Sequence, residues 1–364
     1  MTTTNTHTST NISPQRPSGL SVGEIITHIL ANQRFQIATV LFVLIAAFSI
    51  ARPESFAQLA NFRQIILNAS VLGVIGVGMT FVITTSGIDL SAGAVLVFSS
   101  VVSAIVMRDL GGQGWDVGLI GIVVAIACGL GWGIVNGVLI AYAKVPPLIV
   151  TLGTMGMALG TALIMTDGVD IREVPDAVAV GIGYGNIFGH VPILSVISLI
   201  ICAVGGTVLA YTRFGRHVKA IGSNELAARR VGVKVNRQLV KVYAVAGGLY
   251  GCAGILSLSY FGTTAVGGNN TTVLDVVAAV VIGGTSLFGG VGSVLGTVIG
   301  LFIPAVLQNG FIITGVPPFW QQVAVGGVLI VAVYFDQARR AAATRGSSDE
   351  KWKILKLLLK SGRA

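Results

Sequence analysis

Apolar runs, each about as long as a membrane-crossing helix, recur along almost the whole chain and constrain its fold more than any other feature. A helix needs roughly 20 apolar residues to cross the hydrocarbon core of a bilayer. Only 10% of the 364 residues are charged, against roughly 25% in a typical soluble domain. A soluble globule of this composition would have too few polar side chains to cover its surface. The sequence therefore predicts an all-α integral membrane protein and excludes a soluble enzyme, a disordered protein and a fibrous protein.

Ten of these runs are predicted to be transmembrane helices. They cover residues 35–50, 64–85, 92–107, 117–142, 147–165, 192–211, 242–260, 273–287, 294–307 and 319–335. Together they form a transmembrane domain over residues 34–336. Residues 1–33, rich in Ser, Thr and Asn, are predicted to be a disordered cytoplasmic tail. Residues 337–364 are predicted to be a basic cytoplasmic tail, in which KWKILKLLLK at 351–360 is either an amphipathic helix on anionic lipid or an ordinary solvated segment.

The distribution of charge tests this topology independently. Of 23 basic residues, eight lie in 213–241 beside a single acid, Glu225, and eight more lie in the C-terminal tail. The segment 167–190 instead holds Asp167, Asp170, Glu173 and Asp176 against only Arg172. Since cytoplasmic loops of membrane proteins carry the excess of Lys and Arg, both termini and 213–241 are predicted to be cytoplasmic, and 167–190 external. Topology accounts for the charge, so no nucleic-acid partner is expected.

Small residues four apart predict close helix packing within several spans. These ridges are Gly129, Gly133 and Gly137; Gly156 and Gly160; Gly247 and Gly251; and Gly292, Gly296 and Gly300. Such ridges are shared by channels, transporters and membrane enzymes. The three cysteines, Cys128, Cys202 and Cys252, lie inside apolar runs without paired spacing and predict neither a disulfide framework nor a metal site.

The first segment with polar residues inside apolar surroundings is MTFVITTSGIDLSAG, residues 79–93. A helix runs into Thr84, Thr85 and Ser86, and Asp89 follows before the next apolar run. A carboxylate at this depth is costly unless it sits at a helix end or faces a polar cavity. Two interpretations stay open, a cytoplasmic turn in which Asp89 caps the next helix with Ser91, and a broken span that acts as a gate.

A second segment, residues 273–296, resembles the first at an offset of 200 residues. Thr285 and Ser286 correspond to Thr85 and Ser86, each pair after an apolar run and before a Gly-rich restart. Either the chain holds a weak parallel repeat whose two inward-facing breaks line one pathway, or the likeness is chance similarity between apolar sequences.

The basic segment 213–241 carries the signals of a short cytoplasmic helix that lies along the membrane. Ser223 and Asn224 are good N-cap residues, Glu225 suits the positive end of the helix dipole, and Gly232 stops the helix. Ala227 and Ala228 give this helix a small face that another protein can approach closely.

Three segments together resemble the permease subunits of the ribose-type family of bacterial ATP-binding-cassette importers, which carry monosaccharides. They are GIDLS at 87–91, GSNELAARRVGV at 222–233 and DVVAAVVIGGTSLFGGVGSVLGT at 275–297. The resemblance covers residues 56–335. It implies that the helix around residues 224–230 is a coupling helix, with Gly222, Asn224, Glu225, Ala227, Ala228 and Gly232 at its characteristic positions.

The resemblance also implies a mechanism and a set of partners. The permease would pass a ribose- or xylose-like monosaccharide from a periplasmic binding protein to the cytoplasm by alternating access, in the bacterial inner membrane. Its other partners would be a cytoplasmic ATPase, membrane lipid, and a second permease chain that is either identical or a paralogue. The chain has no GxxxxGK[ST] phosphate loop. ATP and Mg²⁺ are therefore expected on the ATPase, and no catalytic residue, metal or cofactor is expected in this chain.

Polar residues within the apolar spans are the candidates for the pathway. The candidate pathway and gate residues are Asn68, Thr84, Thr85, Ser86, Asp89, Asn136, Thr285, Ser286 and Asn309, with Thr151 and Thr154 as further donors. Most such residues instead bond their own helix or a neighbouring helix.

Three alternatives remain. A branched-chain amino-acid permease is the nearest, although GIDLS favours the sugar branch. An ion-coupled transporter would carry charged residues deep in its spans, whereas Asp89 and Asp275 are predicted to lie near span ends. A membrane enzyme is disfavoured because the four histidines, His7, His28, His190 and His217, are scattered over tails and loops.

Overall fold

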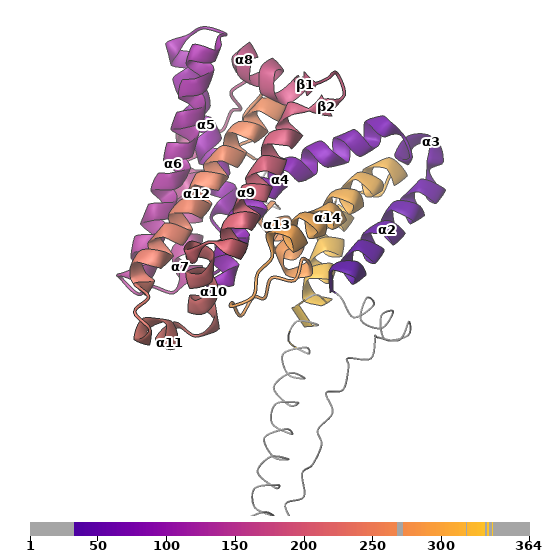
Figure 1. Cartoon of the computed structure of the whole chain (residues 1–364). Coiled ribbons are helices and arrows are strands. Elements are labelled where there is room, and N and C mark those ends of the chain that lie inside the picture. The colour runs from indigo at the N-terminus through magenta and orange to yellow at the C-terminus, as the bar shows by residue number, and fades with distance from the viewer. Residues whose placement is uncertain (1–32, 268–271, 318, 332, 335–336, 338–364) are drawn as a thin grey trace, which may run out of the picture.

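The computed structural model describes residues 33–267 and 272–337, apart from 318, 332, 335 and 336. The predictions for the two tails lie outside these residues. The described part is a bundle of helices (Figure 1) whose β-structure is one hairpin of two-residue strands, β1 (Asn186–Ile187) and β2 (Val191–Pro192). The main helices are α2 (Gln33–Ala51), α4 (Leu59–Thr84), α5 (Ala92–Leu110), α6 (Trp115–Ala141), α7 (Pro147–Thr166), α9 (Ile193–Tyr211), α12 (Val235–Phe261), α13 (Thr272–Ile282) and α14 (Val294–Thr314). Short helices α3 (Pro53–Phe56) and α8 (Asp176–Val178) and a π-helical turn (Ala179–Tyr184) lie toward one end of the bundle. Helices α10 (Arg213–Ser223) and α11 (Glu225–Arg230) lie at the other end.

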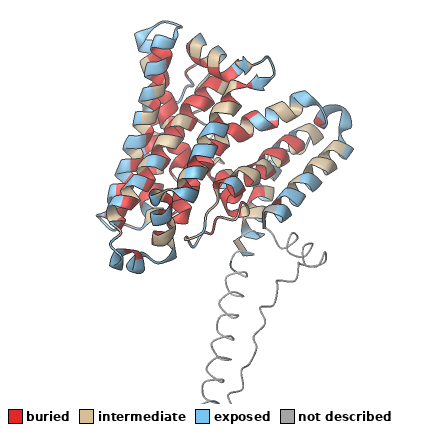
Figure 2. Ribbon diagram, in the orientation of Figure 1, coloured by how far each residue is buried: buried red, intermediate tan, exposed pale blue. Residues whose placement is uncertain are grey.

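Each of the ten predicted spans corresponds to an apolar helix. Seven of these helices are long and apolar enough to cross a membrane, and three are shorter, at 35–51, 272–282 and 319–331. Exposed residues follow the outward faces of α6, α7 and α9 (Figure 2). Many of them are large and apolar, as expected of surfaces that face lipid or another apolar partner. The protein is therefore a multi-pass membrane protein.

The bounds of several predicted spans were wrong. α12 begins at Val235 rather than at 242, because Asn236, Arg237 and Gln238 continue the helix beyond its apolar part. α4 begins at Leu59 rather than at 64, and α14 continues through Pro304 to Thr314 rather than ending at 307. Hydropathy marks the apolar part of a helix and not its ends.

The predicted span 273–287 is the largest of these errors, because α13 is a half-length helix that ends at Ile282. At about 1.5 Å per residue, its 11 residues reach roughly half-way across a bilayer. Glycines set its register against the antiparallel α14, since a Cβ atom on Gly300 would lie 2.2 Å from the carbonyl oxygen of Ala279 and one on Gly296 would lie 1.9 Å from that of Gly283. The same register sets Asp275 level with Pro304, the middle residue of α14.

Glycine ridges bring α6 and α12 into backbone contact. A Cβ atom on Gly129 would lie 2.2 Å from the carbonyl oxygen of Gly247, and one on Gly133 would lie 2.2 Å from that of Tyr243. This confirms close packing for two of the predicted ridges. The ridge of Gly156 and Gly160 on α7 differs, because no described atom lies within 4 Å of either Cβ position.

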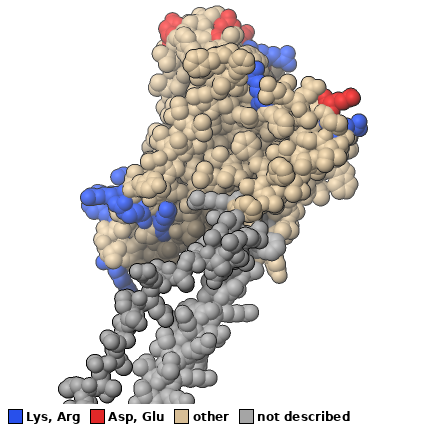
Figure 3. Space-filling model, turned by 45° about the vertical axis from the view of Figure 1, so that its right-hand side comes forward, with Lys and Arg blue, Asp and Glu red and all other residues tan. Residues whose placement is uncertain are grey.

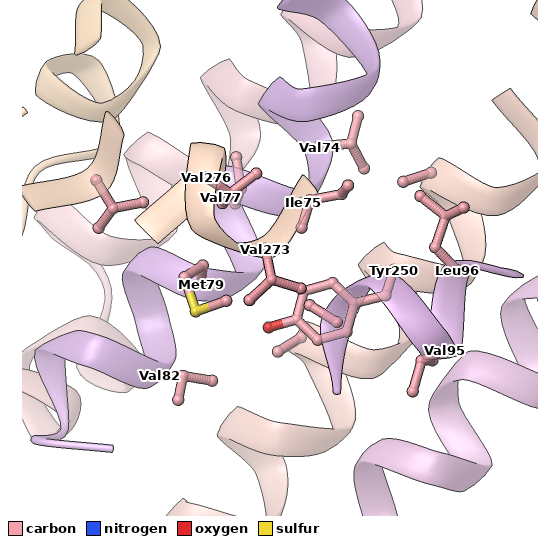
Figure 4. Close-up of a cluster of buried hydrophobic side chains, with 14 of the residues drawn as sticks. Val74, Ile75, Val77, Met79, Val82, Val95, Leu96, Tyr250, Val273 and Val276 are labelled. Atoms are coloured by element: carbon pink, nitrogen blue, oxygen red, sulfur yellow. The ribbon is translucent and has the colours of Figure 1, made fainter. Parts of the chain in front are cut away.

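The core is centred on α12, which packs along α6 and also against α4 and α5. Figure 4 shows Tyr250 of α12 among Val273 of α13, Met79 of α4 and Leu96 of α5. Residues far apart in sequence thus meet half-way along the bundle. This core ties α13, the half-length helix, to the long helices.

Candidate functional site

The largest group of basic side chains in Figure 3 lies at the end of the bundle that carries α10 and α11, whereas the visible acidic side chains, with a few basic ones, lie toward the opposite end. The described start of α2, at Gln33, lies at the same end as α11 (Figure 1). This asymmetry is the one that the sequence predicted.

The predicted short helix in the basic segment is α11. The Asn224 side-chain oxygen accepts a hydrogen bond from the backbone N–H of Ala227 at 2.9 Å, and Gly232 follows the helix with φ of +85°. The predicted cap and stop are therefore confirmed. Sequence reasoning missed the preceding helix, α10, although the spacing of its apolar residues Val218 and Ile221, both buried, is helical.

One face of α11 is anchored and the other is free for contact. Ala228 is buried in a small apolar cluster with Ile221 and Val235. On the outside, Ala227 is exposed beside Leu226, whose exposed fraction is 70%, and Val231, at 79%, follows the helix. Leu226, Ala227 and Val231 thus leave the outward side of α11 with exposed apolar side chains.

Gly222, at the end of α10, lies against the end of α4. Its Cβ position is 1.9 Å from the carbonyl oxygen of Thr84 and 2.5 Å from the backbone nitrogen of Gly290. The N–H of Gly290 in turn donates to the Thr84 carbonyl at 2.9 Å. Three segments, 84–87, 222–223 and 286–292, therefore meet here, and we call this contact the junction.

Ser86 links the three segments of the junction. It has φ of +64°, and its hydroxyl donates to the carbonyl oxygens of Phe288 at 2.8 Å and Gly222 at 3.2 Å. The junction thus joins α10 and α11 to α4 and to the turn between α13 and α14.

The two Thr-Ser pairs of the proposed repeat both lie at this end of the bundle. The Thr285 hydroxyl accepts from the N–H of Ser293 at 3.3 Å, and the N–H of Ser286 donates to the Val291 carbonyl at 3.0 Å. Thr84, Thr85, Thr285 and Ser286 are all buried. In this conformation Thr84 ends α4 and the other three side chains belong to packed turns, so a role in the pathway stays a prediction.

Asp89 lies in the turn between α4 and α5 and is buried. One of its carboxylate oxygens accepts hydrogen bonds from the N–H of Ser91 at 2.9 Å and from the Ser91 hydroxyl at 2.5 Å. The side-chain amide of Asn136 on α6 donates to that hydroxyl at 3.0 Å. The carboxylate thus holds Ser91, the residue before α5, but no side chain caps the first turn of that helix. The Ser91 hydroxyl also links this turn to Asn136 on α6.

The remaining candidates lie on separate helices. Asn68 is half-buried on α4, and Asn309 is buried on α14 with its side-chain oxygen lacking a hydrogen-bond partner. Thr154 donates to the Val150 carbonyl of its own helix at 3.0 Å, and Thr151 donates to that of Ile88 at 3.3 Å. The structure therefore does not bring all the predicted pathway residues together.

Asp275 lies in the first turn of α13, near a helix end as predicted. Because α13 is a half-length helix, Asp275 lies at the depth of the middle of α14. This depth could not be predicted, because several of the residues after Ile282 are apolar or glycine and extend the hydrophobic run.

A cavity of about 340 Å³ lies beside the start of α13 and is walled by residues of α5 and α7. It is lined by Leu90, Gly93, Ala94, Val97, Leu152, Met155, Leu159, Val266, Val273 and Leu274. Its volume falls in the range of about 300–1,000 Å³ that is usual for small-molecule pockets.

The segment 263–266, which contributes Val266 to this cavity, is held by the acidic loop, residues 167–190. The Asp170 carboxylate accepts from the N–H of Val266 at 2.9 Å and from the hydroxyl of Thr264 at 3.2 Å. The Thr264 hydroxyl also accepts from the N–H of Ile171 at 2.8 Å.

Comparison with known proteins identifies the family. The family model of the permease component of branched-chain amino acid transport systems matches residues 61–333. The chain belongs to this permease family. The permease is 37% identical over 311 residues to the ribose import permease protein RbsC of Bacillus subtilis, covering 83% of this chain and 92% of that protein.

Two further relatives support this assignment. The RbsC protein of Escherichia coli is 35% identical to this permease, covering 85% of this chain and 95% of its own length. The xylose transport system permease protein XylH of Escherichia coli is 32% identical, and the match covers 82% of this chain and 92% of XylH. No solved structure matches the permease significantly.

Proposed function

We propose that this permease is the transmembrane subunit of an ATP-driven importer that carries a monosaccharide into the cell. The relatives that support the substrate class are named as ribose, galactose and xylose permeases and are 32–37% identical to it over most of its length. The family model is named after amino-acid transport, which keeps a branched-chain amino acid as the alternative substrate.

The exposed face of α11 is the proposed docking site for a cytoplasmic ATPase, which binds ATP and Mg²⁺. The supporting observation is that α11 presents Leu226, Ala227 and Val231 outward and is joined through the junction to α4 and to the turn after α13. A displacement of α11 would therefore move the ends of two membrane helices, which is what coupling requires.

The proposed orientation places both termini and α11 in the cytoplasm of a bacterial cell, with the permease in the inner membrane. The hairpin of β1 and β2 and the acidic loop then face the periplasm, where a sugar-binding protein would deliver its ligand. A second permease chain, identical or paralogous, would complete the pathway. Support comes from the basic end of the bundle and from the positive-inside rule.

The ATPase contact is tested with Ala227→Arg in the complete importer, with permease, ATPase and binding protein reconstituted in liposomes. A large charged side chain on the exposed face of α11 should abolish sugar uptake and detach the ATPase, while the permease still inserts and folds. Ala143→Arg is the matched control, because Ala143 is exposed in the turn after α6 at the same end of the bundle. Normal uptake by Ala227→Arg would refute docking on α11.

A further inference from the structure

Asp275 is a carboxylate half-way along a membrane bundle, and its position in the fold is unusual. It is half-buried in the first turn of α13, level with the middle of α14. Ionisable residues at such depth are costly and generally line substrate or ion pathways. Within the described residues, no ion pair or hydrogen bond engages its side chain. This carboxylate therefore has no structural partner that explains its presence.

The surroundings of Asp275 distinguish it from Asp89, the other acid that lies between apolar runs. Asp89 is fully buried and bonded to Ser91 within a packed turn. The two residues before Asp275, Val273 and Leu274, line the 340 Å³ cavity. Asp275 is the next residue of α13 and is partly exposed, although its own side chain is not among those that line the cavity.

The chemistry of the cavity calls for a polar group close by. Its lining is almost wholly aliphatic, so it can cover the C–H faces of a sugar but cannot bond the hydroxyl groups. An ionised carboxylate only accepts hydrogen bonds, and its two oxygens can accept from two neighbouring hydroxyls at once. If such a hydrogen bond is removed, the loss of binding free energy exceeds the net contribution of the bond, because the sugar hydroxyl is then left unpaired.

We propose that Asp275 accepts hydrogen bonds from the hydroxyl groups of the sugar as it passes the middle of the membrane. This proposal rests on the proposed function and adds a substrate contact to it. Asp275 favours neutral solutes rich in hydroxyl groups and disfavours anionic solutes. The hydrogen bonds from the sugar hydroxyls replace those from water at the carboxylate. The contact can therefore form and break within one transport cycle.

The test uses the complete importer in liposomes, with whichever of D-ribose, D-xylose and D-galactose the wild-type importer carries. Sugar uptake and ATP hydrolysis are measured together for wild type, Asp275→Asn and Asp275→Glu. Asp275→Asn should retain the stimulation of ATP hydrolysis by the loaded binding protein but carry at least tenfold less sugar per ATP. Asp275→Glu should recover part of this loss. Asp116→Asn, an exposed acid in the first turn of α6, is the matched control and should behave as wild type.

Two results would overturn the proposal. If Asp275→Asn carries as much sugar per ATP as the wild type, the carboxylate does not contact the sugar. A joint loss of transport and of stimulated ATP hydrolysis in the folded variant would assign Asp275 to the conformational switch instead. If the wild-type importer carries none of the three sugars, the proposed substrate class itself is wrong, and this outcome is distinct from the other two.

Discussion

The carbonyl oxygen of Thr84 lies 1.9 Å from the point where a side chain on Gly222 would begin. Two helices that are far apart in the sequence therefore touch through their backbones, and only glycine permits the contact. Backbone contact transmits displacement better than contact between flexible side chains, because it has no rotamers to absorb the movement. This contact is the most direct mechanical link between the proposed ATPase-binding helix and the membrane helices.

Gly222→Ala should therefore separate α10 from α4. The added methyl group overlaps Thr84 and Gly290, and the overpacking should cost about 1–3 kcal/mol. We expect a lower melting temperature in detergent and weaker coupling of ATP hydrolysis to sugar uptake. Gly156→Ala is the matched control, since no described atom lies within 4 Å of its Cβ position. Equal stability and coupling in the two variants would show that the junction tolerates displacement.

The packing of α6 on α12 gives a second comparison, within one helix. Gly133→Ala places a methyl group 2.2 Å from the Tyr243 carbonyl, whereas Gly131→Ala meets no described atom within 4 Å. Both changes raise helix propensity equally, so a difference between them reports packing alone. Gly133→Ala should reduce the yield of folded protein in size-exclusion profiles, and Gly131→Ala should not. Profiles that match would contradict the close contact of α6 and α12.

Asp170 is predicted to hold the segment 263–266 in place. Asp170→Ala removes the acceptor for the Val266 N–H and the Thr264 hydroxyl. At about 1 kcal/mol for a typical hydrogen bond, the opening of this segment should become roughly five- to tenfold more frequent. Hydrogen–deuterium exchange of a peptide that contains Val266 should accelerate accordingly. Glu173→Ala, in the same acidic loop, should leave exchange unchanged, and equal exchange in both variants would contradict this assignment.

Cysteine labelling tests the orientation in the membrane. Phe188, 93% exposed in the hairpin, is predicted to face the periplasm, and Leu226, 70% exposed on α11, the cytoplasm. In intact spheroplasts, a membrane-impermeant maleimide should label Phe188→Cys but not Leu226→Cys, and detergent should make both reactive. The three native cysteines are buried or half-buried, so their background should be low. The reverse pattern would invert the proposed topology.

The sequence alone predicted the membrane class, the apolar runs, the basic end of the bundle and the capped helix α11. These features depend on local signals such as hydropathy, charge and the spacing of Asn224 and Gly232. The junction could not be predicted, because Ser86 lies 136 residues from Gly222 and 202 from Phe288. The half length of α13 was also missed, because Gly283 and Gly284 end the helix without changing the apolar character of the run.

The half length of α13 also limits where this helix can lie in an assembled complex. The first N–H groups of any α-helix have no carbonyl partner within the helix. For α13 these groups lie near the middle of the bilayer, where lipid chains offer no hydrogen bonds and backbone must be satisfied by protein or by water. The described start of α13 is therefore expected to be covered by protein, including other parts of this chain, or by water. The half length of this helix thus restricts how much of it can border lipid in the assembled transporter.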